Sequence, residues 1–143
     1  MPPVIRPPAP RPCDSCPYRC DVPAGIWARE EYEKLRRYDA DTPSQPPRVF
    51  QCHQADAGSD ARRICAGWAG CHEGAGLLAL RLAVIDGTMD STTYQDVIEY
   101  ESPVPLFSSG NEAAAHGEAG IDAPSEEARR MIGKISRARK DLV

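Results

Sequence analysis

The chain has 143 residues, which fits one domain, and a formal net charge of −4. This charge excludes an overall basic field that would attract nucleic acids, so any such contact has to be local. No stretch approaches the roughly 20 apolar residues that span a bilayer, so we expect no membrane segment. The chain contains only two Phe and two Trp but 14 Pro and 11 Gly. Apolar burial alone is therefore a weak basis for the fold, and the six cysteines are the obvious supplement.

Residues 1–12, MPPVIRPPAPRP, predict a proline-rich flexible leader, followed by a single metal-binding domain over 13–143. The leader lacks the charged, apolar, small-residue order of a secretory signal. We therefore expect a cytoplasmic protein, in which clustered cysteines stay reduced and bind metal more often than they form disulfides.

The sequence of the first half of the domain predicts a tight turn, a helix and a strand. Pro17 and Pro23 exclude a regular helix from CDSCPYRCDVPAG. Residues 26–39 then have helical periodicity, and DTPSQPP ends that helix. Residues 48–52, RVFQC, are typical of a short strand.

The second half is mostly helical in pattern. GLLALRLAVI, at the end of the apolar run 64–85, predicts a buried helix, with a turn at Asp86–Gly87. Thr92-x-x-Gln95 is a capping-box signature for a helix to about Glu99. Residues 102–110 are predicted to be extended, 111–117 to form a short helix, and 124–142 an amphipathic C-terminal helix. The predicted fold class is mainly α with short extended segments, a small single domain stapled by a four-cysteine metal site.

Four cysteines indicate that site. Cys13 and Cys16 are separated by two residues in a turn, so both sulfurs can face one ion. Cys52 and Cys65 lie downstream in the contexts FQCH and CAGW. One pair from a turn and two ligands from mid-chain make a closed four-thiolate site, which suits structural zinc or an iron–sulfur cluster.

These motifs carry a resemblance. CDSCPYR, VFQCH and CAGW, followed by LLALRL and PVPLFSSG, resemble an uncharacterised family of small cysteine-rich proteins from actinobacteria and their phages, over residues 13–135. The resemblance implies that cysteines matching Cys13, Cys16, Cys52 and Cys65 recur, and that those matching Cys20 and Cys71 are looser. It implies no activity.

The cofactor expected first is a [4Fe–4S] cluster, with Zn²⁺ as the alternative. Proline directly after a ligand cysteine, as in Cys16-Pro17, is common around clusters. Zinc accepts the same four thiolates, and His53 or His72 could replace one of them. A distant analogy links the chain to the WhiB-like iron–sulfur regulators, small actinobacterial and phage proteins with four cysteines and a basic C-terminal segment. No residue role is transferred from them.

For the other residues near the four cysteines, a role at the metal site and an ordinary structural role are both open. Cys20 and Cys71 are spare thiols or alternative ligands, and His53 and His72 are outer hydrogen-bond donors or surface residues. His53 cannot easily serve Cys52 as a catalytic base, because adjacent residues in an extended segment point to opposite faces. Arg19 either stabilises the negative thiolates or is simply solvated.

The C-terminal helix offers a local basic surface through Arg130, Lys134 and Arg137. These cations could contact phosphates or a protein partner, or could form the solvated face of a docked helix. The oligomeric state is open.

The expected function is a metal-binding regulatory or binding protein, acting on the transcription machinery or on nucleic acid. A zinc-stapled protein-interaction module is the alternative. A metal- or cluster-dependent enzyme ranks third, because four cysteines leave no open coordination position and no catalytic residue is predicted.

Overall fold

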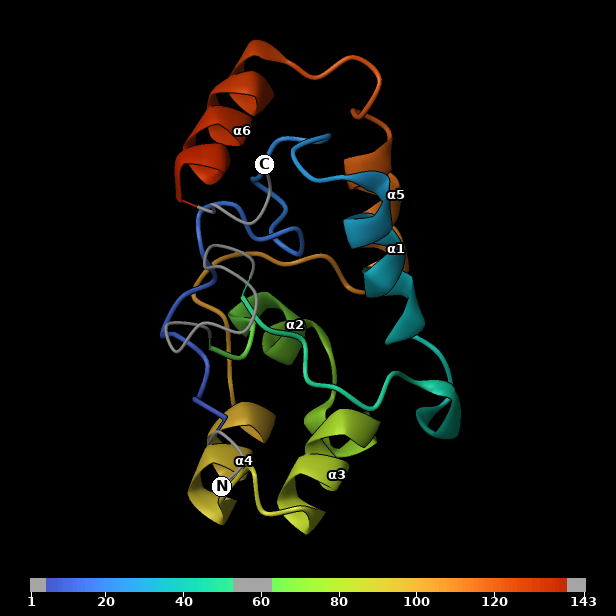
Figure 1. The fold of residues 1–143 in the computed structure, drawn as a ribbon, viewed down its shortest axis with the longest axis vertical. Coiled ribbons are helices and arrows are strands. Elements are labelled where there is room, and N and C mark those ends of the chain that lie inside the picture. Colours follow the sequence, from blue (N-terminus) through green and yellow to red (C-terminus); the bar gives the residue numbers. More distant parts are fainter. Residues whose placement is uncertain (1–4, 53–62, 139–143) are drawn as a thin grey trace.

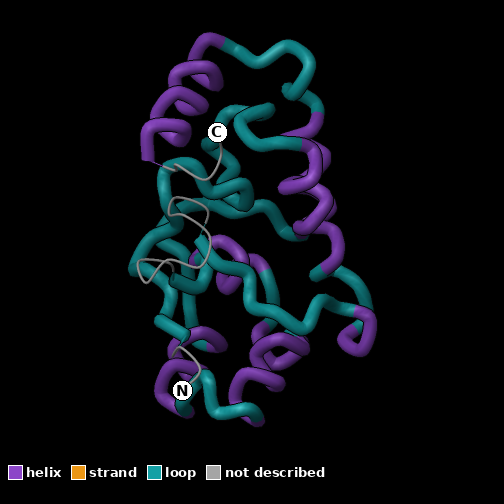
Figure 2. Tube along the Cα trace, in the orientation of Figure 1, coloured by secondary structure: helices purple, strands orange, loops and turns teal. Residues whose placement is uncertain are grey.

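The computed structural model describes residues 5–52 and 63–138, and within them the fold is mainly helical (Figures 1 and 2). Long irregular segments join short helices, as the proline and glycine content predicts. The elements are α1 (Arg29–Arg37), η1 (Thr42–Ser44), α2 (Ala66–Cys71), η2 (Gly74–Gly76), α3 (Leu78–Ile85), α4 (Ser91–Ile98), α5 (Gly110–Glu118) and α6 (Glu126–Ala138).

Helices α1 and α5 lie side by side along one flank of the molecule (Figure 1). Tyr32 and Leu35 form the buried face of α1, and Ala113 and Ala114 that of α5. A Cβ at Gly117 would lie 2.0 Å from the Tyr32 ring, so only glycine lets the α5 backbone pack this closely against that ring.

Helix α2 lies in the middle of the molecule, and α3 and α4 lie together at the end that holds the N-terminus (Figure 1). The buried helix predicted from GLLALRLAVI is buried on one side only. Ala79, Leu80 and Ala83 face the core, whereas Val84 is 40% and Ile85 80% exposed.

The capping-box prediction at Thr92 was wrong by two residues. Asp90 is the N-cap of α4, and its carboxylate accepts the Thr93 backbone N–H at 2.7 Å. An aspartate caps a helix as well as a threonine does and carries a charge that suits the helix N-terminus.

The strand predicted over 48–52 is reduced to one antiparallel bridge between Gln51 and Ile64. A second isolated bridge joins Arg19 to Leu106. These two bridges are the extended pairings within the described residues, and both lie beside the cysteines. The first pairs two mid-chain segments, and the second joins the N-terminal turn to the segment that precedes α5.

Residues 5–12 of the predicted leader run along the domain. The Ile5 N–H donates to the Thr88 carbonyl at 2.9 Å, the Arg6 carbonyl accepts from the Ile64 N–H at 3.2 Å, and the Pro10 carbonyl accepts from the Tyr100 hydroxyl at 3.0 Å. This part of the leader is therefore hydrogen-bonded to the fold.

One core cluster extends from Ile26 on the α1 side to Met89 near α4, so the chain is a small single domain. Helix α6 contributes Ala128 and Ile135 to it, with Met131 and Ile132 packed at its margin. The amphipathic helix predicted here is confirmed as far as Ala138, and residues 139–142 lie outside the described residues. Among the described helices, none has the length and apolarity to cross a bilayer.

Candidate metal centre

The N-terminal cysteines lie in a double turn. The Cys16 N–H donates to the Cys13 carbonyl at 3.0 Å, and the Arg19 N–H donates to the Cys16 carbonyl at 3.1 Å. Such turns project two side chains spaced by two residues toward the same side. The Trp27 indole N–H holds the turn from outside by donating to the Ser15 carbonyl at 2.9 Å.

Arg19 closes this turn with its side chain. The guanidinium donates to the Pro12 carbonyl at 3.1 Å and forms a bidentate pair with Asp21, both bonds at 2.8 Å. Arg19 is only 9% exposed, and its pKa is raised by the hydrogen bond to Asp21 in the first place. Its contacts with the Pro12 and Cys13 carbonyls hold the backbone of the turn.

The mid-chain cysteines are brought together by the bridge at Gln51. The Cys52 N–H donates to the Arg63 carbonyl at 2.7 Å, and the Cys65 N–H donates to the Phe50 carbonyl at 2.8 Å. Gln51 and Ile64 point to one face of this pairing, so Cys52 and Cys65 point to the other.

Helix α2 begins at the site, with Cys65 as its N-cap. The Cys65 sulfur accepts the Trp68 backbone N–H at 3.4 Å. A Cβ at Gly67 would lie 2.3 Å from the Cys16 sulfur, so this glycine lets the helix backbone rest directly against that thiol. The CAGW motif thus supplies a cap and a close contact.

The four cysteines approach one another pair by pair. The sulfurs of Cys16 and Cys65, 49 positions apart in the chain, lie 3.8 Å apart. The pKa of the Cys13 thiol is raised to about 12, chiefly by its hydrogen bond with Cys16, while a hydrogen bond with Cys52 lowers it. The pKa of Cys16 is lowered by the bond with Cys13 but raised well above its usual value overall, by the bond with Cys65 and by burial.

These contacts join all four cysteines in the order Cys52, Cys13, Cys16, Cys65. The described residues do not, however, contain three or more Cys, His, Asp or Glu side chains already arranged as a metal site. Among the described residues, the structure brings the Cys16 and Cys65 sulfurs to within 3.8 Å but shows no assembled four-cysteine metal site.

The other two cysteines lie apart from this set. Cys20 is exposed, and its backbone N–H donates to the Pro105 carbonyl at 3.2 Å. Cys71 stands at the far end of α2, where burial raises the pKa of its thiol to about 12. His53 lies outside the described residues.

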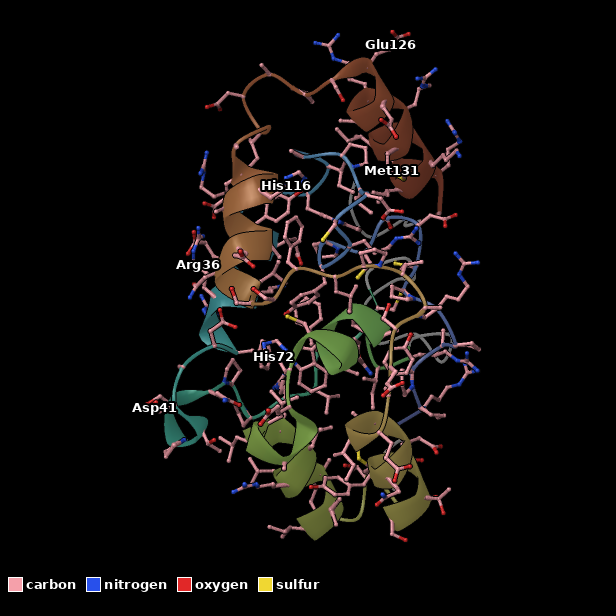
Figure 3. All side chains as sticks on the ribbon, turned by 180° about the vertical axis from the view of Figure 1, so that it is seen from behind. Arg36, Asp41, His72, His116, Glu126 and Met131 are labelled. Atoms are coloured by element: carbon pink, nitrogen blue, oxygen red, sulfur yellow. The ribbon has the colours of Figure 1, made fainter. Side chains whose placement is uncertain are left out.

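Both ring nitrogens of His72 lie within hydrogen-bond distance of protein groups. Its Nδ1 lies 2.9 Å from the Trp68 carbonyl oxygen, and its Nε2 lies 3.2 Å from a carboxylate oxygen of Asp39 (Figure 3). Asp39 also accepts the backbone N–H groups of Gly110 and Asn111 at 3.0 and 2.7 Å. This network ties α1, α2 and α5 together. Nothing in the sequence marked Asp39, because its partners lie 33, 71 and 72 positions downstream.

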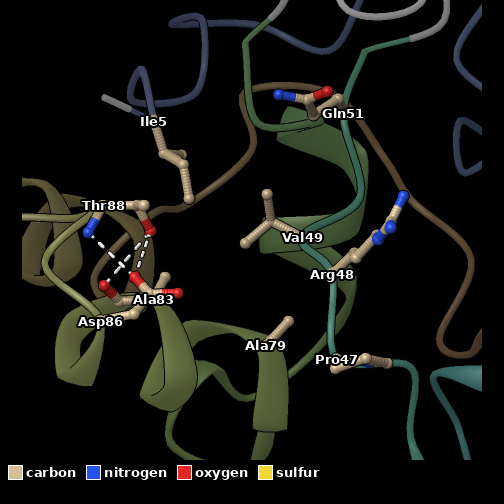
Figure 4. Close-up of a pocket in the computed structure, with 9 residues that line it drawn as sticks. All are labelled: Ile5, Pro47, Arg48, Val49, Gln51, Ala79, Ala83, Asp86 and Thr88. Carbon is tan, nitrogen blue, oxygen red and sulfur yellow. Dashed lines mark hydrogen bonds between the residues drawn. The ribbon is translucent and has the colours of Figure 1, made fainter. Parts of the chain in front are cut away.

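The described surface has hollows beside His72, beside the cysteine turn and near Ile5. One of about 540 Å³ is lined by Asp39, Cys71 and His72 among others, and one of about 230 Å³ separates the Asp14–Ser15 turn from α6. The third, of about 260 Å³, lies near Ile5 and is lined by both apolar and polar residues (Figure 4). Its Asp86 carboxylate accepts both the hydroxyl and the backbone N–H of Thr88. The second hollow is the one closest to the candidate site, because it lies between the cysteine turn and α6.

With this geometry described, comparison with known protein families is informative. A family model matches residues 8–139, which include all four cysteines and the whole of α6. The chain belongs to DUF6283, a family of unknown function. Membership confirms the expectation of an uncharacterised family. No curated protein and no solved structure matches the chain. Since the DUF6283 description carries no activity, function has to be argued from the residues.

Proposed function

We propose that this DUF6283 protein is a small metal-stapled binding protein, in which Cys13, Cys16, Cys52 and Cys65 hold one metal centre. The observation that supports it most directly is the 3.8 Å separation of the Cys16 and Cys65 sulfurs, from segments 49 residues apart. Both a zinc ion and a [4Fe–4S] cluster bind through four thiolates, so the four cysteines alone do not distinguish between these two metal centres.

The centre is proposed as structural. Four thiolates close the coordination sphere and leave no position for a substrate or water. The ligands come from the N-terminal turn and from both sides of the Gln51 bridge, so one metal would join segments that have few regular elements of their own. Metal binding is then part of folding.

An enzyme based on Cys71, His72 and Asp39 is the reading that the geometry disfavours. The pKa of Cys71 is raised to about 12 by burial, so its thiol stays protonated and is a poor nucleophile at neutral pH. His72 is engaged by the Trp68 carbonyl and Asp39, and Asp39 by two backbone N–H groups of α5. These groups hold helices together.

The partner surface is proposed on α6. Arg130, Lys134 and Arg137 are exposed on successive turns of this helix, while Ala128 and Ile135 face the core. Cations on one exposed stripe suit an anionic partner, and nucleic acid is the first candidate. The alternative is an acidic protein surface, which corresponds to a metal-stapled interaction module.

The test is binding of the metal-loaded full chain to a labelled duplex DNA, followed by fluorescence anisotropy at several salt concentrations. We expect binding that weakens with salt, with a log–log slope that drops by about 1 for each cation removed. A variant with Arg130→Ser, Lys134→Ser and Arg137→Ser should bind at least tenfold more weakly. Arg29→Ser with Arg37→Ser, two exposed cations on α1, is the matched control and should change binding little. Equal losses in both variants, or no binding at low salt, would contradict the nucleic-acid assignment and leave the protein-partner alternative.

A further inference from the structure

We propose that Cys16 and Cys65 join in a disulfide when the chain is oxidised, and that this crosslink ties the N-terminal turn to α2 without a metal. The inference goes beyond the proposed metal centre, because it concerns the metal-free chain and needs only these two thiols.

The two sulfurs are placed for this bond. They lie 3.8 Å apart, in direct contact, and both belong to free cysteines. A disulfide bond is about 2.0 Å long. The remaining distance is within the reach of a side-chain rotation at either cysteine.

Packing holds the two sulfurs in one small space. Cys16 is fully buried and Cys65 is 3% exposed. The α2 backbone forms a wall beside the Cys16 sulfur, because a Cβ on Gly67 would come within 2.3 Å of it. The Cys65 sulfur is held at the start of α2, where it accepts the Trp68 backbone N–H at 3.4 Å. The fold thus keeps these two thiols facing each other.

The distance along the chain gives the crosslink its effect. Cys16 and Cys65 are 49 positions apart. A bond between them closes a long loop, which removes more conformational entropy from the unfolded chain than a short loop does. A bond between Cys13 and Cys16 would close only a local turn. Cys13 is also partly exposed, so a disulfide there would be open to attack by external thiols.

The oxidant is a low-molecular-weight disulfide of the glutathione class, and the reaction is two thiol–disulfide exchanges. First, one cysteine thiolate attacks the small disulfide, so that a mixed disulfide forms and one small thiolate leaves. Next, the other cysteine thiolate attacks the protein sulfur of the mixed disulfide, and the second small thiolate leaves. The protein loses two electrons and two protons, and the small disulfide becomes two thiols. Because both cysteines are buried, the exchange takes place while the chain refolds or opens, and folding then shields the bond.

The experiment starts from the full chain, reduced and freed of metal by a chelator in urea. The chain is refolded in buffers with rising ratios of oxidised to reduced glutathione, and free thiols are blocked with N-ethylmaleimide. Digestion with trypsin and Asp-N separates Cys16 from Cys13 by a cut before Asp14 and from Cys20 by a cut after Arg19. Mass spectrometry should find Cys16 crosslinked to Cys65 in most chains under oxidising conditions, with one hydrogen lost from each thiol.

Oxidation of the same chain in concentrated urea is the reference. An unfolded chain favours bonds between cysteines close in sequence, such as Cys13 and Cys16. We expect the ratio of the Cys16–Cys65 to the Cys13–Cys16 crosslink to be at least about tenfold higher after refolding, because folding raises the effective concentration of the contacting pair. Equal ratios, or free Cys16 and Cys65 at every glutathione ratio, would overturn the inference.

Two variants and a rate complete the test. Cys65→Ser should remove the crosslink, whereas Cys71→Ser, at the far end of α2, is the matched control and should leave it unchanged. If Cys65→Ser does not fold, reduction of the crosslinked unmodified chain is the second readout. Dithiothreitol should break the bond at least about tenfold faster in urea than in buffer, because the folded chain shields it. Equal rates would show that the bond is not the buried one and would overturn the inference.

Binding of Zn²⁺ separates this inference from the proposed metal centre. The crosslinked chain has lost two of the four proposed ligands, so its Zn²⁺ affinity should be at least about tenfold weaker than that of the reduced chain. An unchanged affinity would contradict the metal centre while supporting a crosslink that is independent of it. A reduced chain that binds Zn²⁺ but never forms the crosslink would overturn this inference and leave the metal centre standing.

Discussion

At the scale of single residues, Gly67 is the position where the backbone and the candidate metal centre meet. It lies inside α2, where alanine would ordinarily be preferred by about 1 kcal/mol. A Cβ there would lie 2.3 Å from the Cys16 sulfur and 2.8 Å from the Tyr18 Cβ, neither of which can move freely because both residues are fully buried. The steric conflict therefore outweighs the helix propensity.

We predict that Gly67→Ala destabilises the protein by about 1–3 kcal/mol, the range of an overpacked core. Urea unfolding of the metal-loaded chain measures the change. Gly76→Ala is the matched control, because a Cβ at Gly76 meets nothing within 4 Å. If both variants unfold at the same urea concentration, α2 does not rest against Cys16 as described.

The residue scale also separates what the sequence could predict about the site from what it could not. The spacing of Cys13 and Cys16 predicts a pair of side chains close together, because a local turn brings such residues to the same side. The contact of Cys16 with Cys65 spans 49 positions, and the hydrogen bonds that the α5 backbone N–H groups donate to Asp39 span more than 70. No local pattern encodes pairings at that separation, so the role of Asp39 was not predictable.

At the scale of elements, α1 and α5 are joined by an ion pair as well as by close packing. Arg36 contacts Glu118 of α5 and also Glu33 of its own helix. The side chains of Arg36 and Glu118 are 31% and 16% exposed. The Arg36 hydrogen bond lowers the pKa of Glu118 below its ordinary value of 4.5. A depressed carboxyl pKa contributes stability that is present above the unfolded value and is lost as the pH falls through the folded value.

We predict that Glu118→Gln costs about 0.5–1 kcal/mol at pH 7, the usual range for a partly exposed pair. The difference from the unmodified chain should shrink as the pH falls below 4.5, because protonation of Glu118 then removes the same charge. Urea unfolding of both proteins at pH 7, 5.5 and 3.5 measures this. The exposed Glu101, changed to Gln, is the control. A difference that stays constant with pH would mean that the ion pair does not contribute.

Helices with strong local signals were predicted well. Helix α5 begins at the Ser109 cap, whose hydroxyl accepts the Glu112 N–H at 3.1 Å, and α6 follows its apolar periodicity. The strand over 48–52 shrank to a bridge, because its partner segment pairs only at Ile64. The start of α4 moved because Asp90 competes for the cap that Thr92 was expected to provide. Local rules fail where a neighbouring or distant residue offers a better partner.

At the scale of the whole molecule, the cysteine turn and α6 lie next to each other. Ile135 is 6% exposed and lines the hollow shared with Asp14 and Ser15, the residues between Cys13 and Cys16. The turn that would bind the metal is thus also the surface on which α6 docks. If metal binding is coupled to folding, any loss of packing at this contact weakens the metal affinity as well.

We predict that Ile135→Ala destabilises the metal-loaded chain by about 2–4 kcal/mol, the usual cost of removing a buried isoleucine side chain. Since about 1.4 kcal/mol corresponds to tenfold, the apparent zinc affinity should fall by a factor of about 30 or more when the metal-free chain is unfolded. Competition with a zinc-binding dye gives the affinity, and urea unfolding gives the stability. Ile85→Ala is the matched control, because Ile85 is 80% exposed and should change either quantity by less than about 0.5 kcal/mol. Lost stability with unchanged zinc affinity would show that the metal-free chain is already folded, and that the centre fine-tunes a fold that apolar packing alone can hold.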